Sequence, residues 1–291
     1  YGLAGDFARA IALSAEADEI SRRTGNLWGQ SYSRLSLGPL YMGRGEFGRA
    51  IEVMEECIRL GEQAGFMVPL VQTRLFMAKA YADLGDTERA FELAALARPL
   101  VEQYFPAWKP SYFGMIAHMR LVEGNVAAAQ AMIVEGFGGA EPEFHPFANG
   151  VLYFADAEVA VAVGDYERAV SLGERLVAPL RAYGIRFLAL DPLYSQGRAL
   201  LVLGRADEGR AALEDVRTEA EEMGARWHLW RILFTLSLIE AQAGNEAAAG
   251  VLHDQAREII GYIADHTGSA ALRASFLALP EVRAVLDDDS I

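Results

Sequence analysis

The segment Gly45-Glu46-Phe47-Gly48-Arg49-Ala50 decides the fold, because variants of it return along the whole chain. Each variant begins with a glycine, and these glycines are Gly5, Gly45, Gly85, Gly124, Gly164, Gly204 and Gly244. Their spacings are 40, 40, 39, 40, 40 and 40 residues. A fixed period of this length is the sequence signature of a repeat architecture. The chain is therefore predicted to be built from repeats of about 40 residues.

Each repeat divides into two halves. In most units a second glycine follows 20 residues after the first, and these are Gly25, Gly65, Gly184 and Gly224. Both halves carry apolar residues three and four apart, as at Ile232, Leu233 and Leu236, which indicates helices. Glycine in left-handed geometry ends a helix, and an Asp or Asn after it is a preferred N-cap. The unit is predicted to be a helix-turn-helix pair.

Small residues flank each turn at fixed distances. Seven residues before the turn glycine stand Gly38, Ala78, Ala117, Ala157, Gly197 and Ser237. Five residues after it stand Ala10, Ala50, Ala90, Ala129, Ala169, Gly209 and Ala249. Small residues at these places let the two helices cross closely, and pairs that cannot bury their apolar faces alone must stack. We therefore predict an all-α fold, one elongated, right-handed α-solenoid.

The repeat resembles the tetratricopeptide superfamily. Leu37-Gly38-x-x-Tyr41, then Gly45-Glu46-Phe47, then Ala50 match that consensus in order and spacing. The units exceed the family's usual length of about 34 residues and lack its closing proline, so longer helices are expected. This long variant is similar to the sensor regions of large bacterial signalling ATPases, including the maltose-regulon activator type. The segment 272–286 resembles the C-terminus of bacterial proteins in which a nucleotide cyclase or AAA-type ATPase domain precedes such an array.

The repeat register sets the expected organisation of a single solenoid over residues 1–291. It comprises 1–25 as the second helix of a truncated repeat, then repeats 26–65, 66–105, 106–144, 145–184, 185–224 and 225–268, and a cap and tail over 269–291. Because the chain starts at Tyr1 in mid-pattern, we interpret it as a fragment of a longer protein.

Two segments interrupt the pattern. In 104–110, aromatic residues and two prolines replace the closing glycine, and proline stops a helix. The segment 136–147 contains three glycines, two prolines and three phenylalanines, which shortens the preceding helix. It is predicted to be a hinge, a binding loop, or a decayed repeat whose phenylalanines fill the gap left by a lost helical turn.

Composition excludes several classes of protein. The 291 residues are 52% hydrophobic, which argues against disorder, and the single cysteine argues against a disulfide scaffold. A net charge of -14 disfavours nucleic acid or anionic lipid as partner. The most apolar stretch, 151–163, is interrupted by Asp156 and Glu158, so no membrane span is expected. A cytoplasmic location fits these features.

No catalytic constellation is apparent. The five histidines are scattered over different units, without the spacing of a helical metal pair, and are expected at surfaces or boundaries. No phosphate-binding loop is present in the sequence. We therefore expect no enzymatic activity in this chain, no cofactor and no metal.

The resemblance implies where a partner would bind. In tetratricopeptide arrays the first helix of each unit lines a concave groove. The positions that point into the groove in that family correspond here to Tyr32, Leu35, Gln72, Lys79, His118, Phe154, Glu158, Tyr194, Arg198, Arg231 and Phe234. The same positions also include Met42, Leu75, Asp83, Leu121, Asp191 and Leu201. This lining lacks the repeated Asn and Lys/Arg clamp of chaperone-binding members, which disfavours a chaperone-tail receptor.

Three functions remain open. The first is an interaction scaffold whose groove binds a protein or peptide segment, including one from another domain of the same chain. The second is a sensor in which a small effector controls an upstream cyclase or ATPase domain. The third is self-association into dimers. An enclosed pocket of about 300 Å³ or more would favour the sensor, and an open trough would favour the scaffold.

Overall fold

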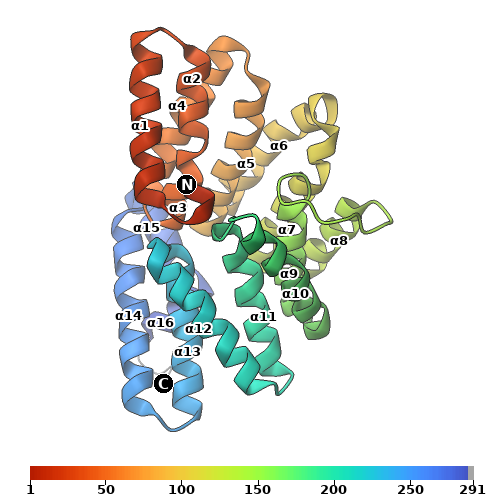
Figure 1. The fold of residues 1–291 in the computed structure, drawn as a ribbon, viewed down its shortest axis with the longest axis vertical. Coiled ribbons are helices and arrows are strands. Elements are labelled where there is room, and N and C mark those ends of the chain that lie inside the picture. The colour runs from red at the N-terminus through yellow and green to blue at the C-terminus, as the bar shows by residue number, and fades with distance from the viewer. Residues whose placement is uncertain (288–291) are drawn as a thin grey trace.

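The computed structural model describes residues 1–287, which contain sixteen α-helices and three short 3-10 helices and no strand. Figure 1 shows their order along the chain. The elements are η1 (Gly2–Ala4), α1 (Phe7–Arg23), α2 (Leu27–Leu35), α3 (Leu37–Gly43), α4 (Phe47–Ala64), α5 (Met67–Asp83), α6 (Thr87–Tyr104), η2 (Pro106–Trp108), α7 (Lys109–Val122), α8 (Val126–Phe137), α9 (Gly150–Val163), α10 (Tyr166–Ala182), η3 (Phe187–Ala189), α11 (Leu190–Val202), α12 (Ala206–Met223), α13 (Arg226–Gln242), α14 (Glu246–Asp265), α15 (Ala270–Leu277) and α16 (Pro280–Leu286). The predicted all-α repeat fold is confirmed.

The turns between helices have the predicted geometry. All seven turn glycines have positive φ, from 75° at Gly204 to 96° at Gly5, a region that L side chains rarely adopt. The carboxylate of Asp86 accepts a hydrogen bond from the backbone N of Arg89 at 3.1 Å, which caps the next helix. Asp6, Asn125 and Asp165 cap their helices in the same way.

One first helix is broken by a proline. Pro39 has no N–H to donate to the carbonyl of Leu35, and its ring crowds that carbonyl. The helix is therefore interrupted at Ser36, and α2 and α3 together form the first helix of their unit.

Close crossing of paired helices is achieved by the small residues. Ala50, Ala90, Ala129, Ala169 and Ala249 have no exposed surface. A Cβ built on Gly38 would lie 2.7 Å from Cγ of Met54 on the facing helix α4. The space at the crossing is thus already filled by the partner helix.

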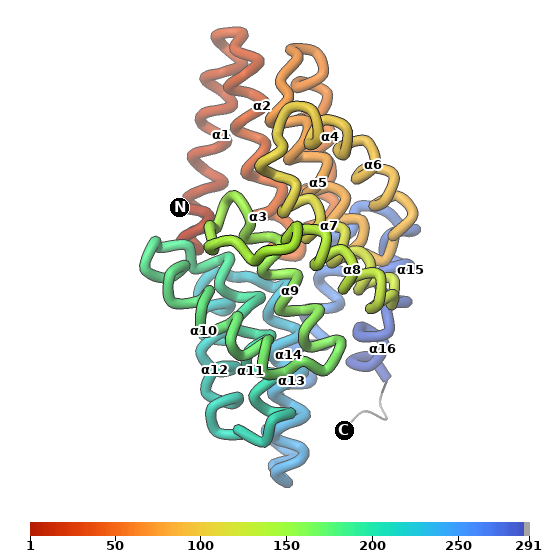
Figure 2. Tube along the Cα trace, turned by 90° about the vertical axis from the view of Figure 1, so that its right-hand side faces the viewer, coloured from red at the N-terminus to blue at the C-terminus, as the bar shows by residue number. Residues whose placement is uncertain are grey.

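The first helices of successive units form an inner layer that closes on itself. Contacts run from α3 to α5, α7, α9, α11 and α13 in turn, and α13 contacts α3 again. The second helices of the units lie outside this circuit, each packed on its own first helix. Figures 1 and 2 show the result, with the red and orange N-terminal helices stacked above the blue C-terminal helices.

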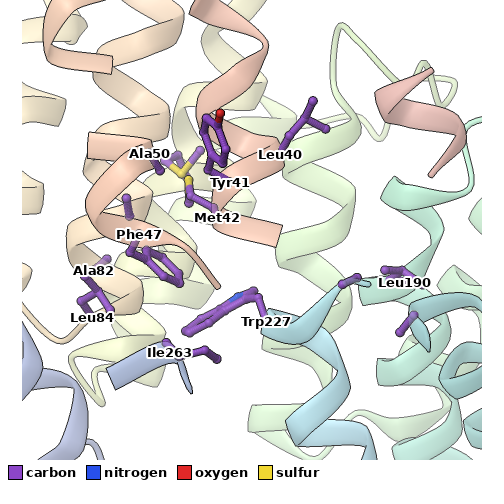
Figure 3. Close-up of a cluster of buried hydrophobic side chains, with 14 of the residues drawn as sticks. Leu40, Tyr41, Met42, Phe47, Ala50, Ala82, Leu84, Leu190, Trp227 and Ile263 are labelled. Atoms are coloured by element: carbon purple, nitrogen blue, oxygen red, sulfur yellow. The ribbon is translucent and has the colours of Figure 1, made fainter. Parts of the chain in front are cut away.

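A seam of apolar contacts joins the first two units to the last two. Phe47 packs edge-on against Trp227 of α13, with ring centroids 4.9 Å apart, and Phe7 meets Phe187 at 5.0 Å. Figure 3 shows Phe47, Trp227 and Ile263 meeting there. The backbone N of Gly48 donates a hydrogen bond to the carbonyl oxygen of His266 at 2.7 Å. Solenoid repeats ordinarily contact only their neighbours, so this seam is a long-range addition to the predicted fold.

The loop that follows α8 is anchored to the core. The rings of Phe137 and Phe144 both pack on Tyr153, at centroid distances of 5.2 and 5.6 Å, so two of the three phenylalanines fill the gap in the pattern. The carboxylate of Glu141 pairs with Arg175 at 2.7 Å. Phe147, by contrast, is exposed.

The segment predicted to be a cap contains the two short helices α15 and α16, while residues 288–291 of the predicted tail lie outside the described part of the chain. Among the helices of residues 1–287, none has the length and apolar character that a bilayer crossing requires.

We predict that Gly38→Leu lowers the free energy of unfolding by roughly 1–3 kcal/mol, because its side chain must displace Met54 at a filled helix crossing. Urea denaturation followed by circular dichroism measures the change. Gly250→Leu is the matched control, since a Cβ there meets nothing within 4 Å, and it should leave stability unchanged or raise it by up to about 1 kcal/mol. Equal destabilisation by both substitutions would contradict the assigned crossing.

We further predict that Gly48→Val opens the seam. Its Cβ would lie 2.7 Å from Cα of Gly268, and a backbone atom cannot rotate away as a side chain can. The radius of gyration measured by small-angle X-ray scattering should rise while helical circular dichroism persists, because each repeat keeps its own contacts. An unchanged radius, equal to that of Gly250→Val, would show that the seam does not set the curvature.

Candidate functional site

The inner helices bring a set of charged side chains together, here named the inner charge cluster. Its members are Lys79 and Asp83 of α5, His118 of α7, Glu158 of α9, Asp191 of α11, His228 and Arg231 of α13, and Glu281 of α16. They come from five inner helices and the C-terminal helix, and most are at least partly shielded from solvent.

His118 bridges two carboxylates at the centre of the cluster. Its Nε2 donates to Oδ1 of Asp83 at 2.7 Å, and its Nδ1 donates to Oε2 of Glu158 at 2.9 Å. The Asp83 side chain is almost fully buried. A doubly protonated imidazole satisfies both carboxylates at once, so the geometry favours the charged form of His118.

The electrostatic balance agrees with this arrangement. Burial and the charge of Lys79 oppose protonation of His118, but Glu158 and Asp83 outweigh them and raise its pKa to about 9. Burial disfavours the charge of Asp83, but attraction and hydrogen bonds from Lys79 and His118 lower its pKa to about 2. Asp83 and His118 are therefore both charged at neutral pH.

Lys79 completes the first half of the cluster. Its Nζ donates to both carboxylate oxygens of Asp83, at 3.0 and 2.8 Å, and lies 3.4 Å from Nε2 of His118. Burial works against the ammonium, yet Asp83, Asp191 and Glu158 together raise the pKa of Lys79 above its usual value. The ammonium group of Lys79 is thus ion-paired within the circuit of inner helices and does not extend into solvent.

The second half of the cluster centres on α13. Nε2 of His228 lies 3.2 Å from Oδ1 of Asp191, and burial of Asp191 is outweighed by His228 and Lys79, so the pKa of its carboxyl lies below the usual range. Nδ1 of His228 is buried and has no hydrogen-bond partner within residues 1–287. The ring of Phe187 stacks edge-on against His228 at 5.5 Å, which links the cluster to the seam.

Arg231 packs against the rings of two tryptophans. Its guanidinium carbon is 4.2 Å from the ring centroid of Trp227 and 4.7 Å from that of Trp230, distances that give cation–π attraction. Its Nη2 donates to Oε1 of Glu281 at 2.7 Å. The Arg231 side chain is 21% exposed and that of Glu281 is 50% exposed.

The structure brings some of the predicted lining residues together. Lys79, His118, Glu158 and Arg231 lie in the inner charge cluster, and the predicted Asp83 and Asp191 join them. Arg198 is exposed, and its guanidinium carbon lies 5.5 Å from the Tyr194 ring centroid. The hydroxyl of Tyr194 is 3.0 Å from Oγ1 of Thr235, which ties α11 to α13.

Other predicted lining residues pack elsewhere. Phe154 contacts the loop residue Phe144, Phe234 lies 5.9 Å from the ring of His253 on α14, and Tyr32 stacks on Trp28 at 4.3 Å. Leu35 and Gln72 are half-buried on α2 and α5. Met42, also in the lining register, is buried in the core.

Two members of the cluster were missed from the sequence. His228 stands three residues before Arg231 and so shares its helix face, a signal that was available. Nothing in the sequence around Glu281 indicates that it belongs to the cluster, because its position depends on how the C-terminal helices fold back onto the repeats. The expectation that every histidine lies at a surface or boundary is wrong for His253, which is buried.

The cluster offers ion pairing rather than an evident reaction centre. Each of its carboxylates is hydrogen-bonded or ion-paired with a lysine, histidine or arginine side chain. The described residues contain no group of three or more side chains arranged to hold a metal ion.

Two hollows lie at the joints between distant units, away from the cluster. One of about 350 Å³ lies between Asp6 and Arg186, and one of about 470 Å³ lies between Arg89 and Leu272. None of the residues lining these two hollows belongs to the inner charge cluster.

Comparison with protein-family models and with curated proteins finds no match. Among solved structures, a tetratricopeptide repeat protein from Parabacteroides merdae ATCC 43184 aligns with a TM-score of 0.51 and 13% identity, over 96% of this chain and 100% of that one. The chain has a tetratricopeptide-repeat fold. At this identity the likeness concerns the fold alone.

A second solved structure is a signal transduction ATPase with numerous domains that has a tetratricopeptide repeat sensor, from Pyrococcus horikoshii. It aligns with a TM-score of 0.49 and 16% identity, over 89% of this chain and 40% of that one.

We predict that the tetratricopeptide-repeat fold loses stability as pH rises because of His118. Its pKa is raised from 6.5 to about 9, so its contribution is complete below about pH 6.5 and is lost as pH rises through about 9. A shift of this size corresponds to on the order of 3 kcal/mol. Unfolding in urea at pH 6 and pH 9.5 should show a larger loss for the native chain than for His118→Gln, by about that amount. Parallel losses in both chains would contradict the bridging role of His118.

Proposed function

We propose that this domain is a non-catalytic binding module that receives a segment of a protein partner against its inner surface. The partner is a separate protein or another domain of the same polypeptide, and the module is a regulatory part of a larger bacterial signalling protein. The observation that carries the proposal is the inner charge cluster, which gathers opposite charges from successive repeats. Fold-level likeness alone supports binding in general, whereas named side chains support a particular surface.

The chemistry of the inner surface favours a polar partner segment. Glu158 and Asp191 are 31% and 39% exposed, so each has carboxylate surface left after its internal pairing. Arg198 is exposed beside Tyr194 and offers a planar guanidinium. The best-fitting segment therefore offers a cation to the two carboxylates and a carboxylate to Arg198. Aromatic and arginine side chains side by side are also the residues most often responsible for binding energy.

A small-effector sensor is the second candidate, and the seam favours it. Because contacts between the first and last units close the inner circuit, a ligand that loosens or tightens them changes the curvature of the whole array. Such a change is a global response to a local event, and it would act on an upstream cyclase or ATPase domain. The two hollows of about 350 and 470 Å³ are open to solvent rather than enclosed, so the sensor rests on the seam and not on a formed pocket.

We predict that Arg198→Glu abolishes capture of the partner by the immobilised chain from lysate of the source organism. The substitution reverses the charge on the inner surface without removing a buried contact, because Arg198 is exposed. Tyr194 is kept, since its hydroxyl ties α11 to α13. Quantitative mass spectrometry should find a protein at least tenfold depleted with Arg198→Glu.

The matched control is Arg98→Glu, an exposed arginine on the outer helix α6, which should retain the partner. Equal capture by the native chain and both variants would remove the inner surface as the binding site. Thermal shift against metabolites would then test the sensor, because a ligand that binds only the folded chain raises its melting temperature.

A further inference from the structure

The C-terminal helix α16 presents one face to the interior of the array. Val282 and Val285 have no exposed surface, and Glu281 pairs with Arg231. Glu281 and Val285 are four residues apart and Val282 and Val285 are three apart, spacings that place side chains along one side of a helix, so these three residues form one contact face. Arg283, on another side, is exposed. The helix is therefore a short amphipathic segment that docks through a carboxylate followed by two valines.

The receiving side is arranged for a carboxylate. Arg231 packs against the rings of Trp227 and Trp230, and its Nη1 also donates to the carbonyl oxygen of Trp227 at 3.4 Å. With only 21% of its side chain exposed, the guanidinium has lost most of its water, and such a charge requires an anionic partner. A planar guanidinium fixed in this way suits side-on recognition of a carboxylate by two N–H groups.

Glu281 supplies that anion in two contacts, 2.7 Å from Nη2 and 3.4 Å from Nε of Arg231. Burial disfavours the Glu281 charge, but Arg231 outweighs it and lowers the pKa of the carboxyl. The same carboxylate is repelled by Asp83 and attracted by His118. Half of its side chain remains exposed, so the pairing is open to competition from solvent.

The attachment of α16 is slight compared with that of the repeats. The helix has seven residues and contacts only α14 and α15 among the larger element contacts, whereas each inner helix packs on several neighbours. Short terminal elements with few buried apolar residues open at lower free energy than the body of a fold. Displacement of α16 therefore does not require the repeats to unfold.

We propose that Arg231, packed against the rings of Trp227 and Trp230, is a carboxylate-binding subsite for an acidic amphipathic helix of the partner, and that α16 fills this subsite in the free domain. The inference rests on the proposed function, since it names the chemistry of the segment that the inner surface receives. The partner helix carries Glu or Asp at one position and aliphatic residues one and four positions later, as Glu281, Val282 and Val285 do. The chain's own helix then competes with the partner for Arg231.

The test uses the full chain and a fluorescent peptide of residues 279–287, Leu279-Pro280-Glu281-Val282-Arg283-Ala284-Val285-Leu286-Asp287. Val282→Asp in the chain releases α16, because it places a charge where no surface is exposed. Fluorescence anisotropy should show the peptide binding to this variant at least tenfold more tightly than to the native chain.

Two matched changes assign that binding to the carboxylate. Adding Arg231→Gln to the Val282→Asp chain, or replacing the peptide's glutamate by glutamine, should each weaken binding at least tenfold. Binding that is indifferent to both changes, or no binding to the Val282→Asp chain, overturns the proposal.

A second measurement keeps the test decisive if Val282→Asp fails to fold. In Glu281→Gln, hydrogen exchange of the α16 amides should be at least tenfold faster than in the native chain, with α14 amides unchanged. Equal exchange in α16 would show that the Arg231 pairing does not hold the helix, and the proposal would fall. A partner still captured through Arg198 in that case would leave the proposed function standing, so the two failures are distinguishable.

Discussion

The close approach of Gly48 to Gly268, with Phe47 packed on Trp227, is the constraint on which the rest of the structure depends. It brings the first repeats back onto the last ones, so the inner helices meet in a closed circuit instead of an open spiral. A side chain at Gly48 would collide with backbone atoms, which is why only glycine fits there. In most solenoids curvature is the sum of small rotations between neighbours. Here a direct contact between distant repeats sets the overall curvature of the array.

Closure determines the electrostatics of the interior. Polar side chains on the concave side of an open solenoid remain hydrated, and each keeps its charge with little help from neighbours. Within the closed circuit Asp83 loses nearly all contact with solvent, and its charge survives because Lys79 and His118 lie within hydrogen-bonding distance. Buried ion pairs of this kind are weak evidence for stability, since desolvation offsets much of the attraction. Removing one partner of such a pair is nevertheless costly, because it leaves an uncompensated buried charge.

The features that could be predicted from the sequence are the local ones. The repeat period, the left-handed turn glycines, the Asp and Asn caps and the small residues at the crossings each depend on residues within one unit, where periodicity carries the information. The proposal of His118 and Arg231 as lining residues came from the resemblance to tetratricopeptide arrays and not from the period, and their binding role stays a prediction. The seam could not be predicted, because Phe47 and Trp227 are brought together by rotations accumulated over the intervening repeats. The membership of Glu281 in the cluster could not be predicted for the same reason. That of His228 could have been predicted from its spacing to Arg231.

Helix α13 connects the three parts of the structure within little more than one turn. Trp227 packs in the seam, the adjacent His228 pairs with Asp191 in the cluster, and Arg231 holds Glu281 of α16. The ring of Trp227 faces both Phe47 and the guanidinium of Arg231, so one side chain takes part in the seam and in the carboxylate subsite. Replacing Glu281 by a carboxylate of another chain therefore acts on the same turn of helix that holds the circuit closed. The seam, the cluster and the carboxylate subsite therefore share residues at the start of α13.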